Sequence, residues 1–354
     1  MASSRPTTTY LSAENIVRLV ETVGLSRFFA GVASRIERDF LRWEQFDKSA
    51  RVACHSRDGV IELMPIADER EFAFKYVNGH PKNTVSGLPT VMAFGVLADV
   101  LTGAPVFLSE LTLVTAIRTA AMSVVAARLL ARPDSRTMAL IGNGAQSEFQ
   151  ALAFRDLIGI RTVRLYDVDP AATRKLVNNL RDRGLEIVVC ASAAEAANGA
   201  DIVTTVTADK TNATILTADM IEPGMHINAV GGDCPGKTEL DSRVLEMGPV
   251  FVEFEPQSRI EGEVQQMPAD FAATELWRVL AGEAHGRENA QQVTVFDSVG
   301  FALEDYSALA FMRDAASEYG IGEVLELILT TENPKDLFGA LRVSERMESI
   351  AAAA

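Results

Sequence analysis

Cysteine and histidine are scarce in this chain, and basic residues never form a run. Three cysteines and four histidines among 354 residues are too few and too scattered for a disulfide framework or for metal-ligand spacing, so no metal site is predicted. The formal net charge of −15 argues against a nucleic-acid partner, because phosphate binding needs clustered Lys and Arg.

A signal peptide and a membrane span are not predicted either. The first residues have no apolar core. The longest apolar stretch, about Leu111 to Ala131, contains Arg118 and many alanines, which favours a buried helix over a membrane-spanning one. We therefore expect a protein of the reducing cytoplasm that has no membrane partner.

The order of sequence patterns indicates two kinds of structure. Ser12 to Trp43 predict two helices, and Arg51 to Glu110 predict short strands separated by Gly, Pro and Asn. From Arg136 to about Val299 strands and helices alternate, which is typical of a doubly wound parallel sheet. Ser307–Tyr319 and Ile321–Thr330 are expected to be helices that return to the first part.

A glycine-rich turn lies at the start of the alternating region. The apolar run Thr137–Ile141 stops at Gly142-Asn-Gly144, and an amphipathic helix follows at once. Glycine lets backbone approach a ligand closely, and the unpaired N–H groups of the first helical turn attract an anion. This is how a dinucleotide pyrophosphate is held. Ser147 replaces the third glycine of G-x-G-x-x-G, so a turn that binds nothing is the alternative.

A carboxylate follows where a dinucleotide site needs one. Asp167 ends a second apolar strand, Thr162–Tyr166, 23 residues beyond Gly144. Such a carboxylate can accept hydrogen bonds from the adenosine ribose hydroxyls, and its charge repels a 2′-phosphate. The sequence therefore predicts NAD rather than NADP as the cofactor.

The predicted fold class is α/β, with a doubly wound Rossmann-type NAD domain over residues 131–309. The rest, residues 1–130 and 310–354, forms a discontinuous α+β domain. Strands of the α+β domain are expected near Arg51–His55, Val60–Met64, Phe72–Val77, Thr90–Asp99 and Pro105–Ser109. Strands of the NAD domain are expected near Met138–Ile141, Val163–Tyr166, Ile187–Cys190, Ile202–Thr205, His226–Val230, Val250–Glu253 and Val293–Asp297.

Asp233 is the first candidate for chemistry. It follows a strand and the pair Gly231-Gly232, and ligands of doubly wound sheets bind at such strand ends. Pro235 keeps the preceding backbone extended. A carboxylate beside the nicotinamide ring can act as a general acid or base toward an amine. A turn aspartate that bonds nearby N–H groups is the alternative.

Charged residues inside apolar segments form a second set of candidates: Arg51, Lys75, Arg118 and Glu62. Unpaired cations are costly among apolar neighbours, and a substrate carboxylate would pair them. Each cation taken alone could instead be a surface or salt-bridged residue. Glu62 is expected to meet an ammonium group, or to be the buried partner of one of these cations.

Two further segments have a structural interpretation. His80 lies in a loop with Gly79 and Pro81, and we favour a loop-shaping role over general-base catalysis because it lacks an obvious orienting partner. The acidic segment Arg259–Glu263 is interpreted as a solvated turn.

Six strings of the sequence form a combination of their own: Arg51–Pro65, Phe74–Asn83, Thr115–Ala120, Ile141–Gln150, Val230–Leu240 and Phe296–Phe301. Together they closely resemble the ornithine cyclodeaminase family, which also contains mu-crystallin, and in particular its bacterial ornithine-specific branch. The resemblance runs from about Arg51 to Ala310. It implies a homodimer, joined through the α+β domains, that converts L-ornithine into L-proline and ammonia with NAD as an internally recycled hydride carrier.

The resemblance also implies roles for individual residues. Asp233 would be the catalytic acid and base, and the substrate-binding residues would be Arg51, Glu62, Lys75, Arg118 and Val299. Arg51, Lys75 and Arg118 would hold the α-carboxylate. The NAD site would contain Thr90, Asn143, Gly144, Ala145, Gln146, Asp167, Thr207, Asn228, Ala229, Val230, Lys237 and Ser298.

Three alternatives stay open at the level of sequence. The first is a lysine cyclodeaminase or a ketimine reductase of the same family, since one methylene changes binding by only about 1–3 kcal/mol. The second is a non-enzymatic ligand-binding protein, as mu-crystallin is. The third is an amino-acid dehydrogenase that releases NADH.

Overall fold

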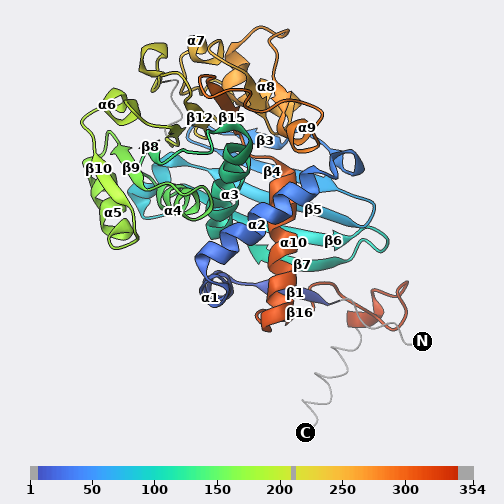
Figure 1. Cartoon of the computed structure of the whole chain (residues 1–354). Coiled ribbons are helices and arrows are strands. Elements are labelled where there is room, and N and C mark those ends of the chain that lie inside the picture. The colour runs from blue at the N-terminus through green and yellow to red at the C-terminus, as the bar shows by residue number, and fades with distance from the viewer. Residues whose placement is uncertain (1–6, 209–212, 342–354) are drawn as a thin grey trace.

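Two β-sheets organise the computed structural model, which describes residues 7–208 and 213–341 (Figure 1). Sheet A contains β1 (Thr8–Leu11), β2 (Asp47–Lys48), β3 (Val52–His55), β4 (Val60–Ala67), β5 (Glu71–Gly79), β6 (Val91–Asp99), β7 (Pro105–Glu110) and β16 (Glu323–Leu325). Its strand order is β16-β1-β7-β6-β5-β4-β2, with β3 paired to β4. The β1–β7 pairing is parallel and the others are antiparallel, so the sheet is mixed.

Sheet B is parallel throughout the part of the chain that the structure describes. Its strands are β8 (Thr137–Ile141), β9 (Thr162–Tyr166), β10 (Glu186–Val189), β11 (Ile202–Thr205), β12 (His226–Ala229), β13 (Val250–Val252), β14 (Thr274–Glu275) and β15 (Thr294–Asp297). The order β10-β9-β8-β11-β12-β15-β13-β14 makes the connections run outward from β8 in both directions. The carboxyl ends of β8 and β11 therefore form the crevice where such sheets bind ligands. This confirms the predicted α/β class.

Ten α-helices are found in the described ranges. They are α1 (Ala13–Val23), α2 (Leu25–Phe40), α3 (Thr112–Leu130), α4 (Ser147–Leu157), α5 (Pro170–Leu180), α6 (Ala193–Ala197), α7 (Ser242–Leu245), α8 (Glu255–Glu261), α9 (Leu276–Leu280) and α10 (Ala302–Tyr319). The side chain of Ser12 caps the start of α1, since it accepts a hydrogen bond from the Asn15 N–H at 3.2 Å.

Helix α3 lies between the two sheets and contacts both of them, through β6 on one side and β12 and β15 on the other. It is buried on nearly all sides, as expected for a helix that is apolar all round. By length and composition α3 could cross a membrane, but 83% of its most apolar window is buried inside this fold. The prediction of a buried helix is therefore confirmed.

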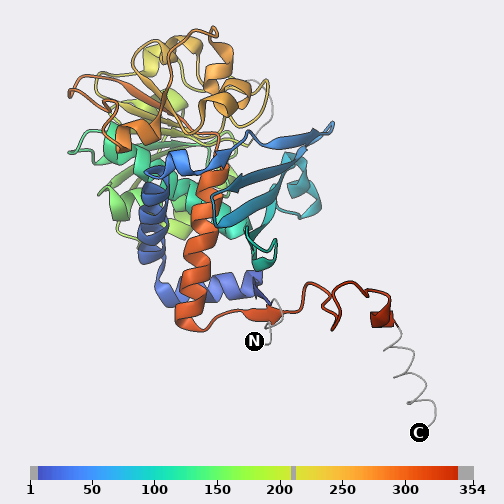
Figure 2. The same cartoon turned by 90° about the vertical axis from the view of Figure 1, so that its right-hand side faces the viewer.

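One face of sheet A is covered and the other is open. Helix α10 packs against β4, β5 and β6, and α2 packs against α10 and α3 (Figure 1). Figure 2, turned by 90°, shows α2 and α10 on one side of the sheet. Among the described residues, this arrangement leaves the outward-pointing side chains of the central strands exposed.

The prediction for the last segment was wrong. Ile321–Thr330 was expected to be helical, but Glu323–Leu325 form the strand β16, antiparallel to β1. The helix ends because Gly320 and Gly322 adopt φ angles of +63° and +126°, which L side chains rarely adopt. Strand β1 was missed because its four residues are too short to show a periodic pattern.

An aromatic cluster joins the two parts of the molecule. Trp43, which follows α2, stacks on Trp277 of α9 with ring centroids 6.0 Å apart, and its ring also lies 5.6 Å from that of Phe301. The Trp43 side chain is only 4% exposed. Aromatic pairs in this distance range add to the free energy gained by burial.

We predict that Trp43→Ala lowers the free energy of unfolding by about 3–5 kcal/mol, because it leaves a cavity between the two parts of the fold. The measurement is urea denaturation followed by circular dichroism. Leu41→Ala is the matched control: Leu41 is 57% exposed, so its substitution should change stability by no more than about 0.5 kcal/mol. Equal stability of the two variants would contradict this role for Trp43.

Candidate active site at the junction of the two sheets

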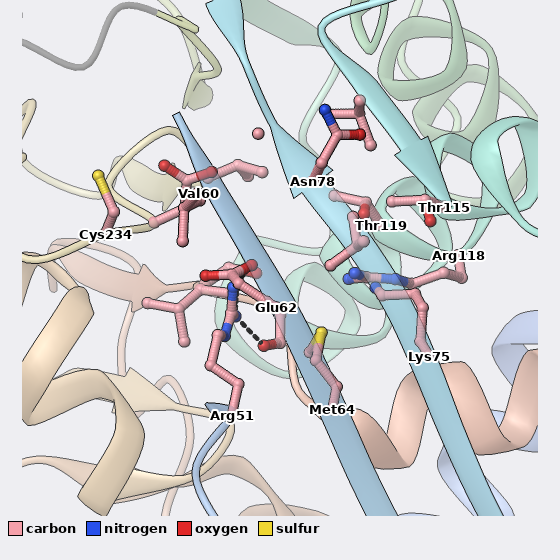
Figure 3. Close-up of a pocket in the computed structure, with 18 of the residues that line it drawn as sticks. Arg51, Val60, Glu62, Met64, Lys75, Asn78, Thr115, Arg118, Thr119 and Cys234 are labelled. Atoms are coloured by element: carbon pink, nitrogen blue, oxygen red, sulfur yellow. Dashed lines mark hydrogen bonds and ion pairs between the residues drawn. The ribbon is translucent and has the colours of Figure 1, made fainter. Parts of the chain in front are cut away.

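A cavity of about 110 Å³ opens between sheet A and the carboxyl edge of sheet B (Figure 3). Strands β4 and β5 form one wall, α3 forms the floor, and the loops after β12 and β15 form the other wall. Its lining includes Arg51, Val60, Glu62, Met64, Lys75, Asn78, Thr115, Arg118, Thr119, Gln146, Val230, Asp233, Cys234, Ser298, Val299 and Gly300. The structure thus brings together the predicted catalytic residue and all five predicted substrate-binding residues.

Lys75 and Arg118 share one carboxylate at the floor of the cavity. Asp305 of α10 lies 2.8 Å from Lys75 Nζ and accepts a hydrogen bond from Arg118 Nε at 3.0 Å. Arg118 Nη1 donates to Glu304 at 2.7 Å. All four side chains are at least 93% buried, so these ion pairs are screened little by solvent.

The protonation of Lys75 is set by its surroundings. Burial, followed by repulsion from Arg118, lowers the pKa of Lys75 to about 8, and Asp305 limits the shift. For Arg118 the pKa is raised: burial alone would lower it, but Asp305 and Glu304 outweigh that effect. At neutral pH both groups carry positive charge.

Arg51 connects the two parts of the molecule. It lies just before β3, and its Nη1 donates to Glu62 at 3.1 Å, the contact drawn in Figure 3. Its Nη2 donates to the carbonyl oxygens of Val299 at 2.6 Å and of Gly300 at 2.7 Å, both in the loop after β15. Its Nε lies 3.0 Å from Glu261 of α8, at an angle that forms an ion pair but no hydrogen bond.

Glu62 realises the second of its two predicted roles, because it is the buried partner of Arg51. Only one carboxylate oxygen is used. The other, Oε1, is buried and has no hydrogen-bond partner in the described residues. An unsatisfied buried carboxylate oxygen is costly, and it is the kind of group that a substrate ammonium would satisfy.

Asp233 stands on the opposite wall, in the loop after β12, with a side chain that is 53% exposed. Lys237 Nζ lies 3.4 Å from Asp233 Oδ1 and donates to the carbonyl of Thr207 at 2.9 Å. The pKa of Lys237 is raised, since attraction by Asp233 and Glu239 outweighs the effect of burial. Asp233 is thus a carboxylate that faces the cavity beside a buried ammonium group.

Carboxylates packed against glycines support the backbone just before Asp233. A Cβ atom placed on Gly231 would overlap the Glu239 carboxylate, and one on Gly232 would lie 2.6 Å from that of Glu263. Glu263 accepts hydrogen bonds from the backbone N–H groups of Glu239 and Leu240 at 2.7 and 3.1 Å. Glycine is required at both positions because no larger residue leaves room for these carboxylates.

The interpretation of Arg259–Glu263 as a solvated turn was wrong. Glu261 is 4% exposed and Glu263 is fully buried. Burial, followed by repulsion from Asp297, raises the pKa of Glu263 to about 8. The sequence contained no sign of this burial, because the partners of the two carboxylates are backbone N–H groups of other segments and Arg51.

Further carboxylates of the site were missed from sequence: Glu253, Glu304 and Asp305. Glu253 accepts hydrogen bonds from Ser298 Oγ at 2.6 Å and from the Val299 N–H at 3.2 Å, so it holds the loop that Arg51 grips. Burial, followed by repulsion from Glu304, raises the pKa of Glu253 to about 8. Two adjacent acids in the otherwise largely apolar first half of α10 were the signal that could have identified Glu304 and Asp305.

The predicted nucleotide loop connects β8 to α4. Gly142 has a φ of +96°, and a Cβ there would lie 2.6 Å from the Val206 carbonyl oxygen, whereas one on Gly144 would meet nothing within 4 Å. Asp167 Oδ2 accepts a hydrogen bond from the Asn143 N–H at 2.5 Å, which fixes the loop against the end of β9. The loop has the shape and the open side that a pyrophosphate needs.

Other predicted NAD residues lie along the same edge of sheet B. Gln146, Val230 and Ser298 line the cavity, and the Oε1 of Gln146 and the Oδ1 of Asn228 are buried without a hydrogen-bond partner among the described residues. Ala145 follows Gly144 in the loop, and Ala229 ends β12. The two unpaired oxygens of Gln146 and Asn228 accept hydrogen bonds, so they fit the donor groups of a nicotinamide nucleotide.

Two of the predicted NAD residues are placed less directly. The Asn143 side chain is turned inward, where its Oδ1 accepts from Thr173 Oγ1 at 2.9 Å, so only its backbone faces the loop. Thr90 lies before β6 and is not part of the cavity lining. A second cavity, of about 570 Å³, adjoins Asp167 and is lined also by Thr173, Arg174 and Cys190.

His80 lies outside the cavity lining, at the start of the loop between β5 and β6. Its Nδ1 is 2.9 Å from the Asn78 side chain. A Cβ on Gly59 would overlap the imidazole ring, so this ring packs closely against the backbone of the neighbouring turn. The contacts fit the predicted loop-shaping role.

Known proteins resemble this chain in sequence and in fold. An ornithine cyclodeaminase of Agrobacterium fabrum is 58% identical over 332 residues, which cover 94% of each chain. A solved structure described as a lysine cyclodeaminase that recognises L-lysine, L-ornithine and L-2,4-diaminobutyric acid has a TM-score of 0.89 and 31% identity, covering 94% of this chain and 99% of that one. An archaeal alanine dehydrogenase dimer with bound NAD has a TM-score of 0.83 and 31% identity, covering 91% and 100%.

The sequence model of the ornithine cyclodeaminase/mu-crystallin family matches residues 13–320, which include every residue of the cavity. The match spans both sheets and the loops that carry the charged groups. This chain therefore belongs to the ornithine cyclodeaminase/mu-crystallin family.

Proposed function

We propose that this protein is an ornithine cyclodeaminase, an NAD-dependent ammonia-lyase that converts L-ornithine into L-proline and ammonia. The observation that carries the proposal is the cavity in which three buried cations face the unsatisfied Glu62 oxygen and Asp233. A relative that is 58% identical over nearly the whole chain is an ornithine cyclodeaminase. An amino acid with a second amine matches both sides of this cavity.

The α-carboxylate of ornithine binds the cations at the floor. Arg118 Nη2 makes no hydrogen bond among the described residues, so this donor is available while Nε and Nη1 stay on Asp305 and Glu304. Lys75 lies beside Arg118 and pairs with the same carboxylate, that of Asp305. Arg51 joins the clamp by releasing Glu62 in favour of the substrate carboxylate, since both are carboxylates of similar geometry.

The amines bind the carboxylates. Once Arg51 holds the substrate, Glu62 is free to accept from an ammonium group, and Asp233 faces the same space from the other wall. Ornithine carries two ammonium groups and one carboxylate at neutral pH, and its two ammonium groups match the two carboxylates, Glu62 and Asp233, that line the cavity.

NAD bound along the edge of sheet B would supply the acceptor for the hydride of ornithine Cα and the donor that returns this hydride to the cyclic imine. The residues of the chain position the substrate and move its protons. Asp233 takes a proton from the α-amine, and the clamp keeps the side chain folded so that the δ-nitrogen attacks Cα of the imine. Ammonia leaves from Cα, and reduction of the cyclic imine gives proline. Ring closure is intramolecular, so orientation replaces a bimolecular encounter.

The NAD site is proposed along the edge of sheet B. Gly144, Ala145 and Gln146 bind the pyrophosphate with their backbone, and Asp167 binds the adenosine ribose, which favours NAD over NADP. Toward the nicotinamide, the proposed residues are Asn143, Thr207, Asn228, Ala229, Val230, Lys237, Ser298 and, from sheet A, Thr90.

The division into domains, residues 1–130 with 310–354 and residues 131–309, belongs to the same proposal. The last 13 of these residues, 342–354, lie outside the described part of the chain. We also propose that the enzyme works in the cytoplasm: no disulfide joins Cys54, Cys190 or Cys234 to one another, as expected in a reducing compartment.

We propose a homodimer that forms through the open face of sheet A. Large apolar side chains point outward there: Ile61 is 41% exposed, Leu63 45%, Phe72 37%, Met92 36% and Phe94 41%. The rings of Tyr76 and Phe94 stack with centroids 5.1 Å apart, so the face includes an aromatic patch. A contiguous apolar patch of this kind marks an interaction surface.

The other members of the family define the alternatives. The neighbour with a TM-score of 0.89 is a lysine cyclodeaminase, so lysine is the second candidate substrate. The other candidates are reduction of a cyclic ketimine, ligand binding without catalysis as in mu-crystallin, and an amino-acid dehydrogenase that releases NADH.

A single assay tests the proposed function. With L-ornithine and catalytic amounts of NAD, the purified protein should release ammonia and proline in equal amounts without accumulating NADH. Accumulation of NADH would indicate a dehydrogenase, and preference for L-lysine would indicate the second candidate. Absence of any product under saturating NAD would overturn the proposal and leave ketimine reduction or ligand binding.

We predict that Asp233→Asn lowers kcat by about 10²–10⁴-fold while NAD binding is retained, because it removes only the acid–base group. Single-turnover kinetics and NADH fluorescence titration measure the two effects. Asp182→Asn is the matched control: Asp182 is exposed, far along the chain at the end of α5, and its φ of +61° suits asparagine. A kcat of Asp233→Asn equal to that of the control would remove Asp233 from the mechanism.

We predict that the double substitution Phe72→Glu and Phe94→Glu converts the dimer into monomers, because two charges cannot be buried unpaired in an apolar interface. Sedimentation velocity gives the molar mass. Leu41→Glu, at an exposed position after α2, should leave the mass unchanged. Retention of the dimer by the double variant would show that the interface lies elsewhere.

A further inference from the structure

The chain continues beyond the edge of sheet A as a projecting segment. After β16 ends at Leu325, the described chain continues over residues 326–341, here called the arm. The arm consists mainly of turns and irregular backbone. Figure 1 shows the arm leaving the molecule near β1 and β16. Figure 2 shows that it runs out on the side of sheet A that faces away from α2 and α10.

The arm is rich in exposed apolar side chains. Leu327 and Ile328 are each 47% exposed, Leu329 is 64%, Leu337 is 62% and Leu341 is 60%. Single exposed apolar residues are common on protein surfaces, but a run of this density is not. Since these side chains gain little cover from their own chain, the arm has the composition of a segment that is buried against something else.

We propose that the arm packs against a second copy of this chain and clasps the dimer. The proposal rests on the dimer proposed above, because the open face of sheet A and the arm lie on the same side of the molecule (Figure 2). A partner bound to that face occupies the space into which the arm projects. Burial of the arm leucines on the partner then removes apolar surface from water on both chains.

The arm lies beyond the part of the chain that the family model matches, which ends at residue 320, before β16. The 332-residue match to the Agrobacterium fabrum ornithine cyclodeaminase extends beyond that point, since it covers 94% of the 354 residues. The strands that carry the apolar side chains of the open face lie within residues 13–320, so removal of the arm leaves that face intact.

Truncation tests the clasp. A chain that ends at Glu326 should fold and bind NAD, but its dimer dissociation constant should rise by about 100-fold or more, as expected when each of the two arms loses at least one buried apolar side chain. A chain that ends at Leu341 is the control, because it lacks only residues 342–354. The double variant Leu329→Asp and Leu337→Asp should match the shorter truncation, and Leu41→Asp should match the wild type.

The copy that each arm contacts is identified by cross-linking in the full-length protein. A photoreactive amino acid at position 337 is introduced into a mixture of ¹⁴N- and ¹⁵N-labelled chains, and mass spectrometry should find heavy–light cross-links. Cross-links only within one chain would overturn the proposal, as would unchanged dissociation constants for the truncation and the double variant. A monomeric wild type would instead refute the dimer on which the proposal rests.

Discussion

A guanidinium or ammonium group costs several kcal/mol to bury without a partner, and the junction of the two sheets buries three such groups: Arg51, Lys75 and Arg118. Their carboxylate partners come from separate elements. Glu62 is on β4, Glu261 ends α8, and the adjacent pair Glu304 and Asp305 is on α10. The need to pair these cations favours the observed position of α10, which packs against the covered face of sheet A and presents its two adjacent acids to Lys75 and Arg118. A shift of α10 by one turn would leave Lys75 and Arg118 unpaired.

The same requirement determines how the two halves of the molecule meet. Arg51 follows the helical N-terminal segment, yet its Nη2 donates two hydrogen bonds to carbonyl groups of the loop after β15. Glu253 binds the other side of that loop through Ser298 Oγ and backbone N–H groups. The loop that lines the cavity is thus fixed between a cation on one sheet and a carboxylate on the other. Positional precision of this kind is what a reaction with aligned groups needs.

The sequence predicted the strands of sheet B well, because buried parallel strands are continuous apolar runs that end in recognisable turns. It also identified Lys75, Arg118 and Glu62 as anomalies, since each charge interrupts an apolar pattern. The sequence could not identify the residues that pair with these charges. Arg118 and Asp305 are separated by 187 positions, and Lys75 and Asp305 by 230. The pairing depends on how the chain returns to sheet A, which local periodicity does not contain.

The two predictions that were wrong, a solvated turn before Glu263 and a helix after Gly320, have the same physical origin. The segment from Arg259 to Glu263 has the composition of a solvated turn, and only the tertiary fold provides the backbone N–H groups that let Glu263 be buried. Local pattern favoured a helix after Gly320, but two glycines with positive φ and an unpaired edge at β1 make the strand β16 more favourable. In both cases a hydrogen-bonding opportunity from a distant element overrides the local preference.

A network with this many internal ion pairs constrains the ligand that can enter it. Breaking the Arg51–Glu62 pair takes a carboxylate from a buried cation and a cation from a buried carboxylate, so a ligand must compensate both charges at once. A compound with only a carboxylate would leave Glu62 without a partner. A simple amine would leave Arg51 Nη1 without an acceptor, although the guanidinium keeps its ion pair with Glu261. A diamino acid compensates both and still presents an amine to Asp233. On the proposed function, selection for ornithine therefore arises from the cost of opening the network as much as from the hydrogen bonds that the substrate itself makes.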